Sequence, residues 1–276
     1  MKRKPKKAYA ARRLGRLATA PMRTLPDFII IGAQKGGTTF LNQLLAQHPR
    51  IRPAFLKEVH YFDLNFDKGV NWYRSNFPVR MGNDGYVTGE ASPYYMFYPH
   101  AARRASAVVP NAKLIALLRN PVDRAYSHYQ HQALRVKGEG QETLSFERAL
   151  EAEGERLRGE EERMLQDERY LSPNHRNYSY LSRGIYVDQL SVWSRFFDRS
   201  QILALNSDDL FDDTPSALAT ILDFLGVPQW MPDAYSISNK GKYNEAISAT
   251  LRQRLEDFFR PHNLRLFDYL GEDFGW

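Results

Sequence analysis

The sequence predicts an α/β fold, a P-loop-like three-layer domain with a central parallel sheet flanked by helices. Two apolar runs of strand length, "DFIIIGA" and "KLIALL", each lead through a polar turn into a segment with apolar residues at helical spacing. A third run, "QILALN", precedes the helix-like segment "TPSALATILDFLG". Continuous apolar runs that alternate with helical segments are typical of parallel strands covered on both faces.

Charge divides the chain into two parts. Residues 1–26 contain nine Lys and Arg residues and no acidic residue, whereas residues 27–276 carry a formal net charge of −3. We interpret residues 1–26 as a basic flexible tail and residues 27–276 as one domain. The tail could make a weak contact with an anionic membrane surface or serve only solubility. Because it lacks interleaved aromatic residues, we expect no nucleic-acid partner.

Composition also limits the compartment and the chemistry. The chain has no cysteine, which excludes a thiol nucleophile, disulfides and thiolate metal sites, and fits a reducing compartment. No apolar run approaches the roughly 18–20 residues that span a bilayer. The basic N-terminus also lacks the apolar core of a secretory signal. We therefore expect a cytoplasmic protein.

The first strand-to-helix turn, "GAQKGGTT", predicts a phosphate site. The start of a helix presents free backbone N–H groups and a partial positive charge, so it attracts anions. Glycines allow a phosphate to approach the backbone closely, a lysine adds positive charge, and threonines add hydroxyl donors. These residues are Lys35, Gly36, Gly37, Thr38 and Thr39.

The order of residues in this turn separates two classes of ligand. Nucleotide hydrolases use GxxxxGK[ST], in which the last hydroxyl binds magnesium. Here Lys35 precedes the glycines, and the strand at 114–118 ends in Arg119 where such an enzyme would place an aspartate. A metal-dependent P-loop kinase or NTPase is therefore disfavoured, and we expect no metal. A non-catalytic protein that binds nucleotides or anions remains the other alternative.

Several segments together resemble one family. They resemble sulfotransferases that use 3′-phosphoadenosine 5′-phosphosulfate (PAPS), most closely the branch that sulfates the O and N atoms of heparan sulfate. The absence of the cysteines that brace the Golgi enzymes indicates a bacterial-type member. The segments are "PDFIIIGAQKGGTTFL", "KEVHYFD", "KGVNWYRSNFP", "GEASPYY", "KLIALLRNPVDRAYSHY" and "FFRPHN".

The resemblance implies where PAPS would bind. Residues 35–39 would hold the 5′-phosphosulfate, and Arg119 and Ser127 the 3′-phosphate. A bidentate guanidinium suits a dianionic phosphate. A loop near the C-terminus would cover the cofactor with Lys240, Gly241, Lys242, Tyr243 and Asn244.

The resemblance also implies the chemistry. Glu58 would be the general base that deprotonates an acceptor, and Lys35 would offset the charge on the leaving 3′,5′-adenosine bisphosphate. His60 is a second catalytic candidate, ranked below Glu58, either as a base in its own right or as an orienting partner. A direct role for His60 would require this stretch to be a loop. The acceptor would be a hydroxyl, in preference to an amine, of a glycan, glycolipid or metabolite.

Acceptor contacts are expected in "GEASPYY". Glu90 would shape the cleft or touch the acceptor, and Tyr94 would stack on it or belong to the core. The 3-O-sulfotransferases carry a lysine after the glutamate where this chain has Ala91, which weakens the case for heparan sulfate as the acceptor.

Overall fold

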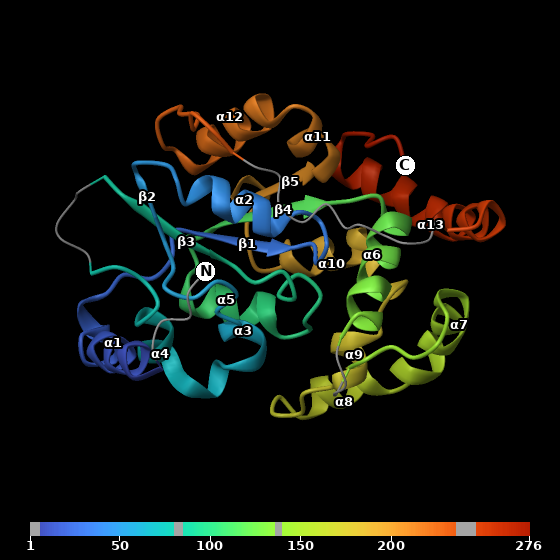
Figure 1. Cartoon of the computed structure of the whole chain (residues 1–276), viewed down its shortest axis with the longest axis horizontal. Coiled ribbons are helices and arrows are strands. Elements are labelled where there is room, and N and C mark those ends of the chain that lie inside the picture. Colours follow the sequence, from blue (N-terminus) through green and yellow to red (C-terminus); the bar gives the residue numbers. More distant parts are fainter. Residues whose placement is uncertain (1–5, 80–84, 136–139, 236–246) are drawn as a thin grey trace.

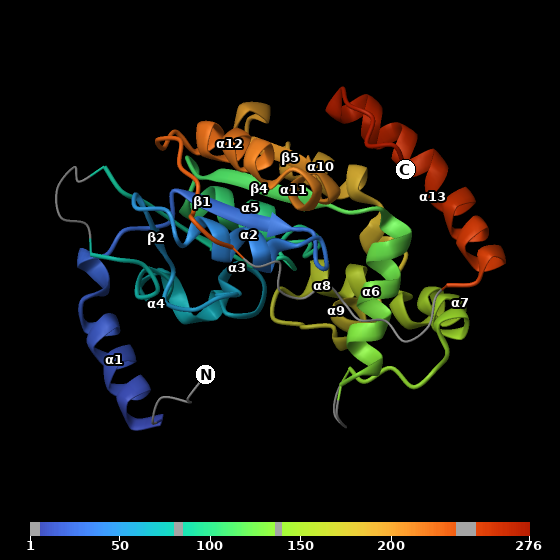
Figure 2. The same cartoon turned by 45° about the horizontal axis from the view of Figure 1, so that its top comes forward.

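The computed structural model describes residues 6–79, 85–135, 140–235 and 247–276, and Figures 1 and 2 show helices arranged around one sheet. The strands found within these ranges are all parallel and lie in the order β2-β3-β1-β4-β5. They are β1 (Phe28–Gly32), β2 (Ile51–Pro53), β3 (Val87–Ala91), β4 (Lys113–Leu118) and β5 (Ile202–Asn206). The predicted fold class is confirmed.

The central strands are apolar throughout because helices cover both of their faces. On one face, Phe28 and Ile30 of β1 pack with three amphipathic helices, α2 (Thr38–Leu45), α11 (Ser207–Asp212) and α12 (Thr214–Leu225). On the other face, Ile29 and Ile31 belong to a larger cluster built mainly on α3 (Tyr61–Leu64), α5 (Ala101–Val108) and α10 (Tyr186–Trp193). Alternate side chains of one strand thus reach opposite layers.

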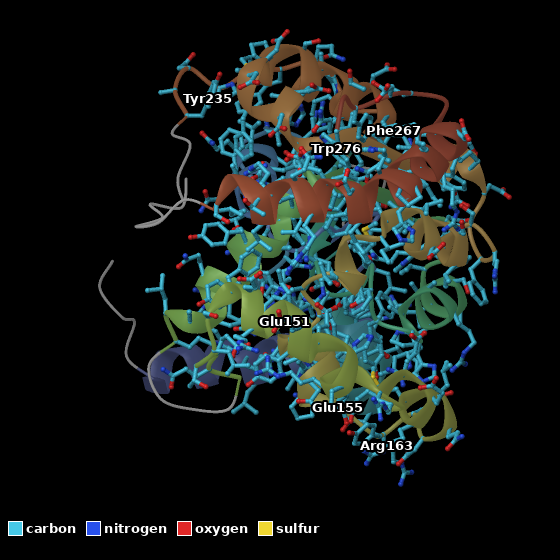
Figure 3. The ribbon with its side chains drawn as sticks, turned by 90° about the vertical axis from the view of Figure 1, so that its right-hand side faces the viewer. Glu151, Glu155, Arg163, Tyr235, Phe267 and Trp276 are labelled. Atoms are coloured by element: carbon cyan, nitrogen blue, oxygen red, sulfur yellow. The ribbon has the colours of Figure 1, made fainter. Side chains whose placement is uncertain are left out.

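A third apolar cluster lies beside the sheet. It joins α6 (Pro121–Ala133), α7 (Phe146–Leu157) and the long α13 (Ala249–Leu270), with Phe259 of α13 fully buried in it. Figure 3 shows the outer side of this region, where Glu151 and Glu155 point outward from α7. In the same view Phe267 and Trp276 lie together, and their ring centroids are 6.1 Å apart.

The N-terminal segment differs from the predicted flexible tail, because residues 6–18 form α1 (Lys6–Ala18). Both cartoon views place α1 beside α4 (Gly69–Arg74). Arg16 donates from Nε to the carbonyl oxygen of Ser75 at 2.6 Å and from Nη2 to that of Phe77 at 2.7 Å. The basic side chain of Arg16 donates hydrogen bonds to carbonyl groups that are left free just after the end of α4. Composition alone does not reveal this role of a basic residue.

Two further short helices in the described residues are α8 (Glu160–Gln166) and α9 (Pro173–Asn177). None of the helices in the described ranges is long and apolar enough to cross a membrane.

Candidate active site

The loops that carry the predicted chemistry meet at one edge of the sheet. β1, β3 and β4 are adjacent and parallel, so the turns that follow them emerge side by side (Figure 1). The glycine-rich turn follows β1, Ser92 follows β3 and Arg119 follows β4. The carboxyl ends of the strands are where open α/β sheets bind ligands.

The glycine-rich turn has the geometry of an anion cradle. A Cβ atom on Gly36 would lie 2.4 Å from the carbonyl oxygen of Leu117, so only glycine fits there. Gly37 has φ of 92° and caps the N-terminus of α2, and Lys35 also has a positive φ of 73°. Thr38 and Thr39 therefore open the helix, where backbone N–H groups have no helical partner.

Positive charge is concentrated around this turn. Burial lowers the pKa of Lys35, and the neighbouring Arg119 lowers it further, while Glu58 opposes both effects. The turn that carries Lys35 and the segment that carries Arg119 follow two paired parallel strands, β1 and β4, and so lie next to each other. An anion bound in the cradle would therefore meet the lysine and the arginine together.

The proposed 3′-phosphate residues lie at the start and middle of α6. Asn120 caps this helix by accepting from the N–H of Val122 at 3.0 Å, and Pro121 occupies its first turn. Arg119 immediately precedes the cap, and Ser127 is buried two turns into the helix. Arg124 is fully buried between them, and its Nε and Nη1 atoms have no hydrogen-bond partner among the described residues.

The proposed base belongs to a chain of three side chains. Nδ1 of His60 lies 2.7 Å from Oδ2 of the buried Asp63, and Nε2 of His60 lies 3.4 Å from Oε2 of Glu58. Glu58 and His60 both have left-handed backbone geometry, with φ of 57° and 52°. This loop, which the prediction required, turns the two side chains toward each other.

The charges in this chain favour a protonated histidine and an ionised glutamate. Burial alone would lower the pKa of His60, but Asp63 and Glu58 outweigh it and raise the pKa to about 9. The hydrogen bond from His60 is the main cause that lowers the pKa of Glu58. Burial raises the pKa of Glu58, but this is the weaker effect, so the pKa stays below its usual value.

Lys57 is a site residue that the sequence analysis did not identify. Its Nζ donates to Oγ1 of Thr39 in the cradle at 2.7 Å and lies 3.4 Å from Oε1 of Glu58. Lys57 thus joins the anion cradle to the proposed base. Its position directly before Glu58 in "KEVHYFD" could have indicated a role for Lys57 in the site. An ordinary surface ion pair between neighbouring Lys and Glu residues has the same sequence pattern, so the sequence does not separate the two.

Glu90 is not accessible to an acceptor, because the residue is only 1% exposed. Its Oε1 accepts from the hydroxyls of Tyr73 at 2.9 Å and Tyr95 at 3.0 Å, and its Oε2 accepts from Ser92 at 2.7 Å. Burial raises the pKa of Glu90. The N–H of Val59 also donates to Oε2, at 3.3 Å. Glu90 therefore fixes the loop that carries Glu58.

Tyr94 belongs mainly to the core, the second of its two predicted roles. It is 4% exposed, and its hydroxyl lies 2.7 Å from Nδ1 of His175. The Arg183 guanidinium lies 4.9 Å from the centre of its ring and also donates to Oε1 of Gln34 in the glycine-rich turn. Tyr94 also lines a cleft of about 340 Å³.

The predicted covering loop, residues 240–244, lies outside the described residues. Within the described ranges, no group of three His, Asp or Glu side chains is arranged to hold a metal ion.

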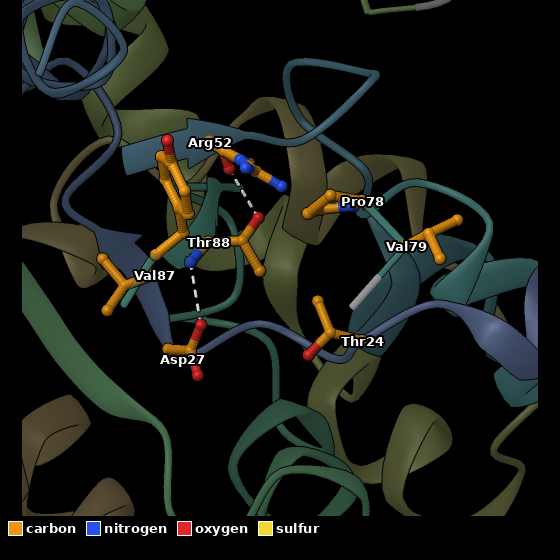
Figure 4. Close-up of a pocket in the computed structure, with 8 residues that line it drawn as sticks. Thr24, Asp27, Arg52, Pro78, Val79, Val87 and Thr88 are labelled. Carbon is orange, nitrogen blue, oxygen red and sulfur yellow. Dashed lines mark hydrogen bonds between the residues drawn. The ribbon is translucent and has the colours of Figure 1, made fainter. Parts of the chain in front are cut away.

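A small cavity at the opposite edge of the sheet is not the ligand site. It has a volume of about 20 Å³, enough for about one water molecule. Figure 4 shows its lining, with the N–H of Thr88 donating to Asp27 at 2.8 Å and the Thr88 hydroxyl donating to the carbonyl oxygen of Arg52 at 2.5 Å. These bonds tie the amino ends of β1, β2 and β3 together.

A glycine-rich turn at the start of a helix on a parallel sheet, with a carboxylate nearby, is typical of group-transfer enzymes that handle phosphorylated ligands. A family model described as "Sulfotransferase domain" matches residues 25–259, and the chain belongs to this family. It is therefore a sulfotransferase.

Relatives agree with this assignment. The chain is 31% identical to human heparan sulfate glucosamine 3-O-sulfotransferase 6, over 94% of this chain and 76% of that protein. It is 32% identical to human heparan sulfate glucosamine 3-O-sulfotransferase 3B1, over 91% of this chain and 65% of that protein. The solved sulfotransferase from Alicyclobacillus acidocaldarius superimposes with a TM-score of 0.69 at 31% identity, covering 91% of this chain and 97% of that one.

Proposed function

We propose that the enzyme transfers a sulfuryl group from PAPS to a hydroxyl group of a glycan, with Glu58 as the general base. The observation that carries this proposal is the meeting of Lys35, Lys57 and Arg119 with Glu58 at one edge of the sheet. The cations suit an anionic donor, and the carboxylate suits an acceptor that must lose a proton. Two relatives are named for the sulfation of heparan sulfate, which supports a glycan as the acceptor.

The residues present fit this donor. The left-handed Gly37 at the N-cap of α2, the free N–H groups at the start of this helix and the Lys35 ammonium together suit a phosphosulfate. Arg119 and the buried Arg124, with its unpartnered nitrogen atoms, offer positive charge for a second phosphate. PAPS would supply the sulfuryl group, and 3′,5′-adenosine bisphosphate would be its product.

The chain's own groups divide the work of transfer. Glu58 accepts the proton of the acceptor hydroxyl as its oxygen attacks, which requires the carboxylate form that His60 maintains. Asp63 holds His60 in place. Lys35 and Lys57 offset the negative charge that grows on the leaving phosphate, and they do so most effectively when water is excluded.

The test is transfer of radioactive sulfate from labelled PAPS to heparosan and to N-sulfated heparosan. We expect the wild type to label at least one of them. Glu58→Gln should lower the rate about 10²-fold or more, as is usual for loss of a general base. Affinity for 3′,5′-adenosine bisphosphate, measured by calorimetry, should stay the same.

Glu272→Gln is the matched control, because Glu272 is exposed and forms no ion pair within the described residues. Full activity in Glu58→Gln would remove Glu58 from the mechanism. Failure of the wild type to label either polymer would contradict the glycan acceptor.

A further inference from the structure

Arg183 is a buried cation whose role the proposed transfer does not explain. It lies in the short helix η3 (Ser182–Gly184) and is 1% exposed. Its guanidinium is 4.9 Å from the ring centre of Tyr94 and 4.9 Å from that of Phe97, so two aromatic rings lie against it. Burial lowers the pKa of Arg183 to about 9, which leaves the side chain positively charged at neutral pH. A buried charge is costly unless other groups satisfy it, so its contacts indicate what it serves.

The guanidinium of Arg183 joins two segments that are far apart in the sequence. Its Nη1 donates to Oε1 of Gln34, in the glycine-rich turn. Its Nη2 donates to the carbonyl oxygens of His175 at 2.9 Å and Arg176 at 3.0 Å, both within α9. These acceptors are all neutral, so in the described residues the charge of Arg183 is satisfied by hydrogen bonds to dipoles. Hydrogen bonds from a charged donor are stronger than those between neutral groups.

The backbone that carries Arg183 is fixed independently of these contacts. The carboxylate of the buried Glu153, on α7, accepts from the N–H groups of Leu181 at 2.6 Å and Ser182 at 2.9 Å. The side-chain amide of Gln189, on α10, donates to the carbonyl oxygen of Arg183 at 3.0 Å. Arg183 therefore projects from a rigid support, and a donor on a rigid support restricts the acceptor that it holds.

Gln34 lies in the part of the glycine-rich turn that needs such an anchor. Two backbone hydrogen bonds fix this turn, from the N–H of Ala33 to Leu117 at 2.7 Å and from the N–H of Gly36 to Ala33 at 2.9 Å. Neither bond holds residues 34 and 35 themselves, and Lys35 has a left-handed φ of 73°. A non-glycine residue keeps this conformation only where its surroundings hold it. The side chain of the half-buried Gln34 supplies that hold through Arg183.

We propose that Arg183 is a positioning residue, which fixes Gln34 and through it holds the glycine-rich turn in the geometry that receives the 5′-phosphosulfate. The proposal rests on the proposed function, because it concerns the donor site of the same reaction. A shift of about 1 Å in a reacting group can cost on the order of 10²-fold in rate, so such an anchor affects catalysis. A lysine would keep the charge but lack the planar set of donors that reaches Gln34 and α9 together.

The test compares the binding of two nucleotides to the full chain by calorimetry. One is 3′,5′-adenosine bisphosphate, and the other is adenosine 3′-monophosphate, which lacks the 5′-phosphate. The ratio of their dissociation constants measures what the glycine-rich turn contributes. We expect the wild type to prefer the bisphosphate, and Arg183→Lys to lower this preference about five-fold or more, because hydrogen bonds from a charged group are lost. Affinity for the monophosphate should stay the same.

Gln34→Met tests the same contact from its other side, because it keeps the length of the side chain and removes the acceptor oxygen. Gln34 is only half-buried, so this variant carries the test even where Arg183→Lys does not fold. We expect each single variant to lose a similar part of the preference, and the double variant to lose no more than either one. Two residues that act through one contact are non-additive in this way.

Arg104→Lys is the matched control for the loss of a buried guanidinium. Arg104, on α5, is 4% exposed and lies 4.6 Å from the ring centre of Phe66 and 5.6 Å from that of Tyr98. Its acceptors in the described residues are Phe62 and Glu168, not the glycine-rich turn. This variant should lower the melting temperature as Arg183→Lys does and keep the full preference for the bisphosphate.

Three results would overturn the positioning role alone: Arg183→Lys keeps the preference, it weakens both nucleotides equally, or its loss adds to that of Gln34→Met. Loss of the preference in Arg104→Lys would overturn it too, because the effect would then follow stability. A wild type that binds neither nucleotide, or binds both equally, would instead overturn the proposed function, and this inference with it.

Discussion

His60 keeps its proton at neutral pH because two carboxylates hold it. Asp63, buried and 2.7 Å away, fixes Nδ1, and Glu58 faces Nε2. The pKa of His60 rises from 6.5 to about 9 although burial opposes the rise. At the scale of the residue, the histidine therefore acts as a fixed positive charge that orients the proposed base and keeps it ionised.

The same pKa shift predicts how stability depends on pH. A group that holds its proton more tightly when folded stabilises the chain fully below its unfolded pKa, and this contribution is lost as pH rises through the folded value. The window here runs from about pH 6.5 to pH 9. Urea unfolding should show a loss on the order of 1–3 kcal/mol across it.

His60→Gln should remove most of this loss. His262→Gln is the control, because His262 forms no ion pair within the described residues. An unchanged slope of stability against pH in His60→Gln would show that Asp63 and Glu58 do not hold the proton of His60.

At the scale of the element, α1 supports the loop that carries Lys57 and Glu58. The guanidinium of Arg16 lies 4.9 Å from the ring centre of Phe55, two residues before Lys57. The N–H of Phe55 donates to the carbonyl oxygen of Asn76 at 2.7 Å, and Asn76 accepts from Arg13 at 2.8 Å. The helix therefore braces the segment from one side.

Deleting residues 1–18 should lower the melting temperature by a few degrees and reduce kcat several-fold. The reason is that Arg13 and Arg16 would be lost, and with them several hydrogen bonds to the main body, each worth about 1–2 kcal/mol. Affinity for 3′,5′-adenosine bisphosphate should stay the same. The control is deletion of residues 1–5 alone. Equal kcat in both truncated chains would show that α1 is dispensable, as the sequence alone suggests.

At the scale of the molecule, the layers of the fold follow from the sequence. The runs "DFIIIGA" and "KLIALL" can be recognised because strands buried on both faces need apolar residues throughout. The helix α1 could not be predicted in the same way. Its composition is that of a soluble tail, and only contacts with residues about 60 positions away, such as Ser75, give it a place.

The candidate site was predictable where one local segment builds it. The cradle at 35–39 is a contiguous pattern, whereas the chain Glu58–His60–Asp63 depends on two left-handed residues that no local rule requires. The sequence could not decide between the two predicted roles of Glu90 for a related reason. Its four hydrogen-bond donors, which bury it, come from different segments of the chain.

The central claim is that the edge of the sheet binds a nucleotide with phosphates at both the 3′ and 5′ positions. The most direct measurement is the thermal stabilisation of the full chain by 3′,5′-adenosine bisphosphate, by AMP, and by ATP with magnesium. A ligand that binds only the folded state raises the melting temperature, and at equal concentrations the tighter ligand raises it more. We expect the bisphosphate to stabilise most, without metal, and Arg119→Gln to reduce its advantage over AMP. Stabilisation by ATP with magnesium alone would contradict the account.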